Sequence, residues 1–536
     1  MNNLPIGLII LTVVAALVYL GIAQRVLDKM RLSDRAAFVI LALIILGSYL
    51  EPFSFGAIGL QINLGGALVP IGVALYLITT ADERREKVRA TIASLGAAAG
   101  ILFFDKVLPI EPGALAFDID SLFLPAIIAA GIAYALGRSR RASFAAGVLG
   151  IVLVDIAAAM ENAYRGLQGV PITIGGAGLF DAVLLTGVLA VVIAEVVGEI
   201  YERITKYTGV KWVKPIALIS LAVMVLSGAL LGGASIVNMN TALIGNELSD
   251  GSYFRLIDNQ NNVLLKTARN IRVGDKYIGA DNIPYRVVSI QGLDAIMEEI
   301  EEIEFIEVRE TQLEGLWRFF TGDEIEDVPQ QEDGPSDRDD RAEQLEPVGP
   351  VIFYHTHNAE SFVSSDGTHS IYGKGGIHEV GSEFKKSLEE LRVTAVHAED
   401  LHLPHDRGAY RRSRRTVSRL LEKDPELLFD IHRDAAPQQV YAEKVDGTWV
   451  TQVLFVVGRQ NQNKNVNLDF ARELKAVADE VHPDLVKGIL VASGNYNQDM
   501  FPRSLLLEVG SHTNARESAE RGIALFSEVV REYLDR

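Results

Sequence analysis

The chain has no cysteine among its 536 residues. This absence excludes disulfide bonds, a thiol nucleophile and any zinc or iron–sulfur site built on cysteine. Histidine is missing from most of the chain as well, because all ten histidines lie between His355 and His512. We therefore expect the last third of the chain to carry the chemistry.

The chain also lacks an excess of basic residues, since its formal net charge is −19. A nucleic-acid surface needs clustered Lys and Arg, so no nucleic-acid partner is expected. Charge is scarce in the first 238 residues, where Leu, Ile, Val, Ala and Gly dominate, and the acidity comes mainly from the remainder. At this length we expect two or more domains.

Long apolar runs fill the first 238 residues, and several have about the 20 residues that cross a bilayer. We count eight candidate spans, near residues 4–24, 36–52, 60–80, 90–108, 121–137, 142–160, 178–198 and 214–236. A cleaved signal peptide is excluded because the basic cluster follows the first run and more runs come after it. An all-α transmembrane bundle of about eight helices, residues 1–238, is predicted.

Basic residues alternate between the loops that separate these runs. Clusters of Arg and Lys follow the first, third, fifth and seventh runs, whereas the loops between them have almost none. Basic loops stay on the cytoplasmic side. This predicts a multi-pass protein of the cytoplasmic membrane whose N-terminus and C-terminal domain are both extracytoplasmic.

Three acids lie in or near the predicted spans: Asp155, Asp181 and Glu195. Charges there are costly and often functional. They either pair within the bundle or serve a transport or proton-relay role, so a transporter or sensor stays open as an alternative function.

Two short regions separate the membrane part from the last domain. Residues 239–310 contain strand-like segments and are expected to form a small extracytoplasmic β-rich unit, with a spacer or docking role. Residues 311–349 are acidic, rich in turn formers and poor in aliphatic side chains. Such a composition is typical of a solvated, flexible linker.

Residues 350–536 alternate between strand-like segments, at 351–354, 393–396, 427–431, 453–457 and 505–507, and helix-like segments, at 381–391, 413–421, 467–481 and 515–533. This alternation predicts an α/β domain with a mostly parallel sheet flanked by helices. Ligands of such sheets bind at the carboxyl ends of the strands. His355 and His357, then His432, and then Glu508 lie at those ends. The set fits an open catalytic metal site. Only one of His355 and His357 is expected as a ligand unless the chain turns between them.

The motifs of this domain resemble the stage II sporulation protein P family, which is related to zinc-dependent N-acetylmuramoyl-L-alanine amidases. The similar segments are Tyr354–Phe362, Phe429–Asp434 and Leu506–Gly510, together with Gly458–Asn461. The resemblance implies a bacterial cell-wall hydrolase that cleaves the amide between N-acetylmuramic acid and L-alanine of peptidoglycan. It implies Zn²⁺ as cofactor, with His432, Glu360 and either His355 or His357 as ligands, and Glu508 as the catalytic carboxylate. The eight predicted spans depart from the family, whose usual member has one anchor.

Further site residues are expected around this centre. Arg433 could stabilise developing negative charge or bind a peptide carboxylate, or it could pair with Asp430 or Asp434. Asn495, Asn497 and Arg503 precede the Glu508 strand and are expected to line the substrate groove.

The expected partners are peptidoglycan, the lipid bilayer and, from the family resemblance, a glycan-cleaving enzyme of the engulfment machinery. Cleavage of peptide cross-links is a further activity that the resemblance allows. A catalytically inactive wall-binding scaffold is the remaining alternative.

Overall fold

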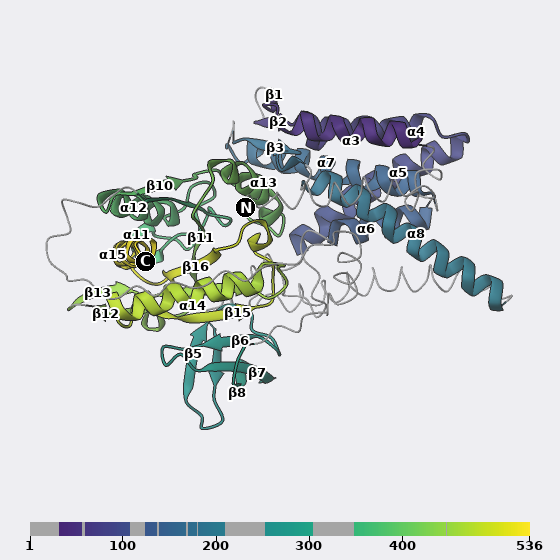
Figure 1. The fold of residues 1–536 in the computed structure, drawn as a ribbon. Coiled ribbons are helices and arrows are strands. Elements are labelled where there is room, and N and C mark those ends of the chain that lie inside the picture. The colour runs from purple at the N-terminus through teal and green to yellow at the C-terminus, as the bar shows by residue number, and fades with distance from the viewer. Residues whose placement is uncertain are drawn as a thin grey trace, which may run out of the picture.

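The computed structural model describes residues 32–55, 59–107, 124–136, 139–167, 170–178, 181–208, 252–303, 348–445 and 447–536. A group of helices comes first in the chain, and a large sheet with its own helices comes last (Figure 1). The first and last predicted spans, 4–24 and 214–236, and nearly all of the predicted linker lie outside the described residues.

The N-terminal part is helical. Its helices are α3 (Asp34–Ser48), α4 (Val69–Thr79), α5 (Arg84–Val107), α6 (Leu124–Leu136), α7 (Arg140–Tyr164) and α8 (Ala182–Thr208). A π-helical turn, Leu64–Leu68, precedes α4, and a three-stranded sheet contains β1 (Phe53–Phe55), β2 (Leu60–Ile62) and β3 (Ile172–Ile174). Small residues let the helices approach closely: a Cβ on Gly147 of α7 would lie 2.7 Å from the carbonyl oxygen of Thr186 in α8. The interior is therefore packed around Ala and Gly.

The predicted eight-helix membrane bundle is wrong. In the described part of the chain, only Arg84–Lys106 and Arg140–Tyr164 are long and apolar enough to cross a membrane. The runs near 36–52, 60–80, 121–137 and 178–198 contain shorter apolar helices: Arg35–Ser48, Leu64–Thr79, Leu124–Ala133 and Ala182–Glu195. The mean hydropathy of a run depends only on its residue types, so it does not tell whether the whole run is helical. The run at 60–80 begins as strand β2 and becomes helical only from Leu64.

The remaining strands form one sheet and one hairpin. The bounds are β4 (Phe254–Ile257), β5 (Val263–Thr267), β6 (Lys276–Ile278), β7 (Pro284–Gln291), β8 (Asp294–Glu299), β9 (Val348–Tyr354), β10 (Val393–His397), β11 (Leu427–Asp434), β12 (Ala442–Val445), β13 (Thr448–Thr451), β14 (Val453–Gly458), β15 (Val486–Ala492) and β16 (Ser504–Ser511). The helices are α11 (Val363–Asp366), α12 (Ile377–Glu390), α13 (Ala409–Leu420), α14 (Lys464–Val481) and α15 (Arg516–Leu534).

The sheet is mixed, which corrects the predicted mostly parallel sheet. Within the described residues, its eleven strands have the order β10-β9-β11-β16-β14-β15-β6-β7-β8-β4-β5. The pairs β14–β16, β15–β6, β6–β7, β7–β8 and β4–β5 are antiparallel. The chain passes from β11 to β14 through the β12–β13 hairpin, without the crossover helix that a parallel partner requires. The β-rich unit, predicted as a small unit with a spacer or docking role, continues the same sheet through the pairing of β6 with β15.

Different helices pack on the two faces of the sheet. Helices α12, α14 and α15 pack on one face, around Phe353, Phe384, Phe429 and Phe526. Alternate residues of β11 point to the other face. There Leu428 packs with Val417 and Leu420 of α13. His432 shares the face of Leu428, so it lies on the side that α13 covers.

Candidate active site

Three predicted ligands converge on one point at the carboxyl ends of β9 and β11. Strand β9 ends at Tyr354, and the turn that follows carries His357 and Glu360 to the end of β11, where His432 lies. Glu360 Oε1 lies 3.2 Å from His357 Nδ1 and 3.3 Å from His432 Nδ1. These three buried side chains could hold a metal ion.

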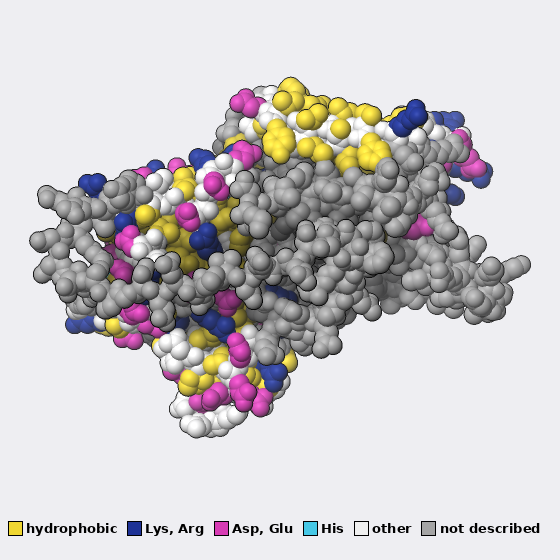
Figure 2. All heavy atoms as spheres, viewed as in Figure 1, with side chains coloured by type: hydrophobic (Ala, Val, Ile, Leu, Met, Phe, Trp, Pro, Cys, Tyr) yellow, Lys and Arg dark blue, Asp and Glu magenta, His cyan; other side chains and the backbone are white. Residues whose placement is uncertain are grey.

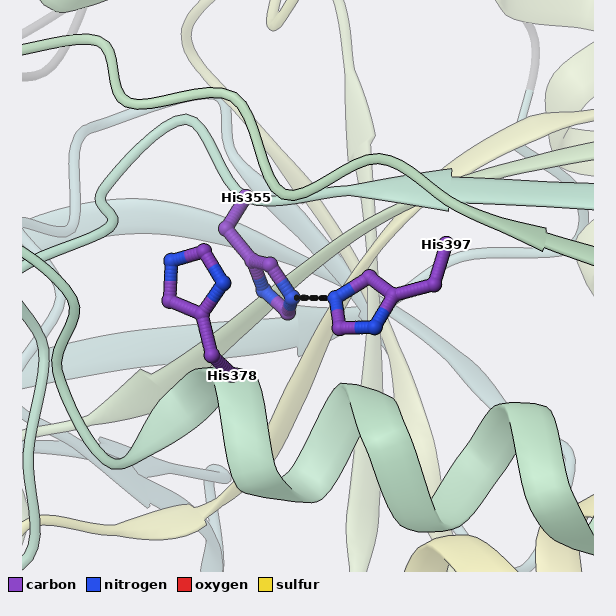
Figure 3. A group of neighbouring side chains, drawn as sticks. All are labelled: His355, His378 and His397. Carbon is purple, nitrogen blue, oxygen red and sulfur yellow. Dashed lines mark hydrogen bonds between the residues drawn. The ribbon is translucent and has the colours of Figure 1, made fainter. Parts of the chain in front are cut away.

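His355 belongs to a different cluster. Its ring lies with His378 of α12 and His397 of β10, and this trio could also hold a metal ion (Figure 3). The chain turns directly after β9, which sends His355 and His357 to different neighbours. The structure thus places His357, not His355, beside Glu360 and His432.

Two carboxylates hold His432. Its Nε2 lies 3.0 Å from Asp430 Oδ1, opposite the Nδ1 that faces Glu360. Burial disfavours the charged imidazole, but Asp430 and Glu360 outweigh it and raise the pKa of His432 well above its usual value. Asp430 is itself fixed by the backbone N–H of Thr356 at 2.8 Å and its hydroxyl at 2.7 Å. A carboxylate behind a histidine in this way orients the ring for a cation on its other side.

Glu508 lies beside this cluster. It is the register partner of His432 across strands β11 and β16, so the two side chains share one face. Burial raises the pKa of Glu508 to about 7, even though the nearby Arg269 opposes the shift. Among the described residues, its Oε2 has no hydrogen-bond partner. This buried carboxylate can therefore exchange a proton near neutral pH.

Arg269 comes from the β-rich unit and was missed by the sequence analysis. It follows β5, is 2% exposed, and forms an ion pair through Nη1 with Glu508 Oε1. Thr267, two residues before Arg269, binds the end of β11, since its Oγ1 donates to Asp434 Oδ2 at 2.7 Å. No local motif marks Arg269, because its partner is 239 residues away. The β-rich unit thus contributes directly to the site and is more than a spacer.

Arg433 holds the turn that carries Glu360. Its backbone N–H donates to Glu360 Oε2 at 3.0 Å, and its guanidinium donates to the carbonyl oxygens of Ser361 and His369. Its charge also helps His432 to keep the pKa of Glu360 well below the usual value, against the effect of burial. Through these contacts Arg433 positions the turn that carries Glu360.

The three predicted groove residues do not join the cluster. Asn497 donates to the carbonyl oxygen of Tyr410 and to the hydroxyl of Ser413, so it anchors α13. Asn495 lies in the same loop after β15. Arg503 precedes β16, at the opposite end from Glu508, and pairs with Glu426 at 3.4 Å.

Helix α13 and the segment before it cover the cluster. The rings of His405 and Tyr410 lie 4.7 Å and 5.4 Å from the ring of His357. Burial lowers the pKa of His405 to about 3, so this ring is neutral. The sequence analysis missed both residues, which lie about 50 positions beyond the first motif.

Helix α13 also docks on the N-terminal helices through buried ion pairs. Arg411 Nη1 lies 3.0 Å from Asp105 Oδ1. Arg415 lies 2.5 Å from Asp155 and 2.8 Å from Asp181. Two of the acids singled out in the sequence therefore pair with the C-terminal domain, and the third, Glu195, pairs with Arg140 at 2.7 Å. Ion pairing therefore accounts for the three charges in or near the apolar runs.

Comparison with known proteins identifies two regions. The family model described as stage II sporulation protein P matches residues 277–531. A model described as protein of unknown function (DUF1614) matches residues 48–193, within the helical part. The two matches separate the chain where the structure changes from helices to the large sheet.

One curated relative and one solved structure illustrate the similarity. Stage II sporulation protein P of Bacillus subtilis (strain 168) is 29% identical over 201 residues, which are 34% of this chain and 50% of the relative. The chain thus spans about half the length of that relative. The crystal structure of N-acetylmuramoyl-L-alanine amidase from Clostridium difficile 630 is 16% identical and aligns over 35% of this chain and 97% of its own, with a TM-score of 0.23 that carries no argument about function. On the family match and the shared motifs, residues 277–531 belong to the stage II sporulation protein P family.

Proposed function

We propose that this protein is a zinc-dependent N-acetylmuramoyl-L-alanine amidase that cleaves peptidoglycan. The proposal rests on the convergence of His357, Glu360 and His432 beside Glu508. All four residues lie within the region that matches the stage II sporulation protein P family. These are the residue types that the family resemblance implies for the ligands and the catalytic carboxylate.

The donor set suits zinc. Two imidazoles and one carboxylate are a common ligand set of catalytic zinc sites, which keep a further position open. The Nε2 of His357 is buried and has no hydrogen-bond partner among the described residues. Glu360 and Asp430 place negative charge around His432, and a cation between the ligands would replace the proton that this ring otherwise holds. When bound there, zinc would polarise the scissile carbonyl and lower the pKa of a water molecule.

The side chains around the ligands supply the proton transfers. Glu508 accepts a proton from the attacking water and donates it to the leaving amine of L-alanine. A pKa of about 7 suits both steps, because the carboxylate then gains and loses a proton at nearly equal free energy. Arg269 fixes one carboxylate oxygen and leaves the other free for this exchange.

The helical part supports a membrane anchor. Apolar side chains cover the outward face of α3 and α4 (Figure 2), including Val39, Leu43, Leu46 and Leu75, each at least 49% exposed. Exposed apolar area of this kind requires a nonaqueous or protein neighbour. We assign lipid as that neighbour.

The distribution of charge indicates on which side of the membrane the catalytic domain lies. Helices α5 and α7 begin with Arg84-Arg85 and Arg140-Arg141, whereas Asp105 and Asn162, near their other ends, contact the catalytic domain. Basic helix ends remain cytoplasmic. The catalytic domain therefore faces outward, toward the cell wall, where an engulfment-type role in sporulation with a glycan-cleaving partner would use it.

The reaction products distinguish an active amidase from an inactive wall-binding scaffold. Purified full-length protein, loaded with Zn²⁺ and incubated with peptidoglycan, is expected to release peptides with free L-alanine amino termini, detected by mass spectrometry. Glu508→Gln should abolish their release, while Glu480→Gln, which changes an exposed ion pair with Arg536, should not. Binding of peptidoglycan without new amino termini in the wild type would reject the proposal.

A further inference from the structure

A second group of histidines lies on the other face of the sheet, outside the proposed catalytic cluster. His355 follows β9, His378 lies in the first turn of α12, and His397 ends β10 (Figure 3). Their ligand atoms all lie within 4.8 Å of one another. His355 and His378 are fully buried, and His397 is partly exposed.

The hydrogen bonds of His355 fix its tautomer. Its Nδ1 lies 2.9 Å from the carbonyl oxygen of Ile431, which can only accept, so Nδ1 carries the hydrogen. The lone pair of a neutral ring is then on Nε2. This Nε2 lies 2.8 Å from Nε2 of His397. Two imidazole nitrogens thus face each other where one cation could bind both.

His378 lies next to His355 and His397, and its ring nitrogens lack hydrogen-bond partners in the described part of the chain. Neither its Nδ1 nor its Nε2 has a hydrogen-bond partner within the described residues, although both atoms are buried. Its ring centroid lies 4.5 Å from that of His355. A buried polar atom without a partner destabilises the folded protein, and coordination of a metal would give one of these nitrogens a partner.

A glycine keeps the space beside these nitrogens open. Gly381 lies on α12 one turn after His378, and a Cβ at this position would lie 2.7 Å from Nε2 of both His355 and His397. Any other residue would therefore intrude on the two facing nitrogens. The absence of a side chain here leaves room where an ion would meet its ligands.

From this geometry we propose that His355, His378 and His397 form a second metal site, distinct from the proposed catalytic one, for a divalent cation that prefers imidazole, such as Zn²⁺, Co²⁺ or Ni²⁺. Neutral imidazoles select these ions over Mg²⁺ and Ca²⁺, which prefer oxygen ligands. Three protein ligands leave a position for water on the partly exposed side of His397. The ion would join β9, β10 and α12 directly before the turn that carries His357 and Glu360.

Metal content tests the second site separately from catalysis. Full-length protein without a polyhistidine tag is equilibrated with Zn²⁺, freed of loose metal by gel filtration, and analysed by plasma mass spectrometry. Two zinc ions per chain are expected, one for each cluster. His378→Gln and His397→Gln should each retain one, and so should His432→Gln, which changes the other cluster. The matched control His482→Gln, whose ring pairs with Glu528, should retain two.

Two further variants keep the test decisive. Gly381→Ala removes no ligand, but its Cβ would crowd the two facing nitrogens, so this variant should bind one zinc ion fewer than the wild type. Circular dichroism verifies that the variant is folded. The double variant His378→Gln/His432→Gln should bind almost none. A wild-type content of one zinc, or unchanged content in the folded His378 and His397 variants, would overturn the second site. Two zinc ions in a protein that cleaves no peptidoglycan would reject only the proposed amidase.

Discussion

Arg269 and Glu508 form an ion pair that is almost completely buried, with exposed fractions of 2% and 1%. The arginine comes from the β-rich unit and the glutamate from β16 of the catalytic domain. The chain directly before Arg269 is held at the end of β11, because Thr267 Oγ1 and the backbone N–H of Ala268 both donate to the carboxylate of Asp434, and this places the guanidinium beside Glu508. The chemistry of the site therefore depends on a segment that precedes the catalytic domain in the sequence.

Replacing Arg269 should shift the pH dependence of cleavage. Glu508 must be ionised to accept a proton, so kcat/KM should rise with pH through the pKa of about 7. Arg269 favours the ionised form, and Arg269→Gln should therefore raise this pKa, by about 1–3 units for an opposite charge in contact. The measurement is the pH profile of kcat/KM with a soluble muropeptide.

The matched control for this experiment is Arg255→Gln. Arg255 lies in the same β-rich unit and pairs with Asp294 at its exposed edge. Its profile should coincide with that of the wild type. An unshifted profile in folded Arg269→Gln would show that another group sets the acid limb.

The two histidines of the first motif should differ in their effect on catalysis. His357→Ala removes a ligand beside Glu360, and kcat/KM should fall by about 10³-fold or more, since a metal contributes several kcal/mol to such a reaction. His355→Ala should reduce kcat/KM much less, because His355 lies in the other cluster. Equal losses in both variants, measured with the same muropeptide, would contradict the assignment of His357.

The docking of α13 on the helices should be a major contribution to stability. Arg415→Ala would leave Asp155 and Asp181 buried without their counter-charge, and such a change costs about 3–5 kcal/mol. Thermal unfolding of the full chain should show a large decrease in melting temperature. Arg536→Ala, which removes an exposed ion pair with Glu480, should cost less than about 1 kcal/mol.

A compensated variant separates lost packing from uncompensated charge at this interface. Asp155→Asn/Asp181→Asn/Arg415→Met removes the whole ion-paired group and should recover much of the stability that Arg415→Ala loses. If the triple variant were less stable than Arg415→Ala, charge burial would not be the cause of the loss.

Acid should destabilise the metal-free protein through its buried histidines. Burial lowers the pKa of His402 to about 4, and its ring bonds the carbonyl oxygen of His355 and the hydroxyl of Thr416 as a neutral group. The unfolded chain binds the proton more readily, so this stability is complete above about pH 6.5 and is lost as pH falls toward 4. The loss is at most about 3 kcal/mol for this residue.

Melting temperatures between pH 7 and pH 4 measure this effect. His402→Gln can make similar hydrogen bonds but does not titrate, so its melting temperature should fall less steeply with acid than that of the wild type. Parallel slopes for the two proteins would show that His402 does not contribute.

Local patterns identified most elements of the catalytic domain. Short apolar runs predicted strands at β9, β10, β11, β14 and β16, and helical periodicity predicted the four long helices that pack on them. Strand β15 was missed, although Gly488-Ile489-Leu490-Val491 is an apolar run. Strand direction was not available from these patterns, because a run of Val, Ile and Leu reads the same in a parallel or an antiparallel pair.

The sequence by itself determined which residue types carry the chemistry, since His432 and Glu508 each end an apolar run and the sporulation-family motifs surround them. Only the tertiary structure decided that His357 and His355 separate, that Arg269 reaches Glu508, and that Arg415 neutralises Asp155 and Asp181. The physical reason is that strand and helix signals arise from neighbours within a few residues. Ion pairs and metal clusters are instead made by residues that folding brings together from distant parts of the chain.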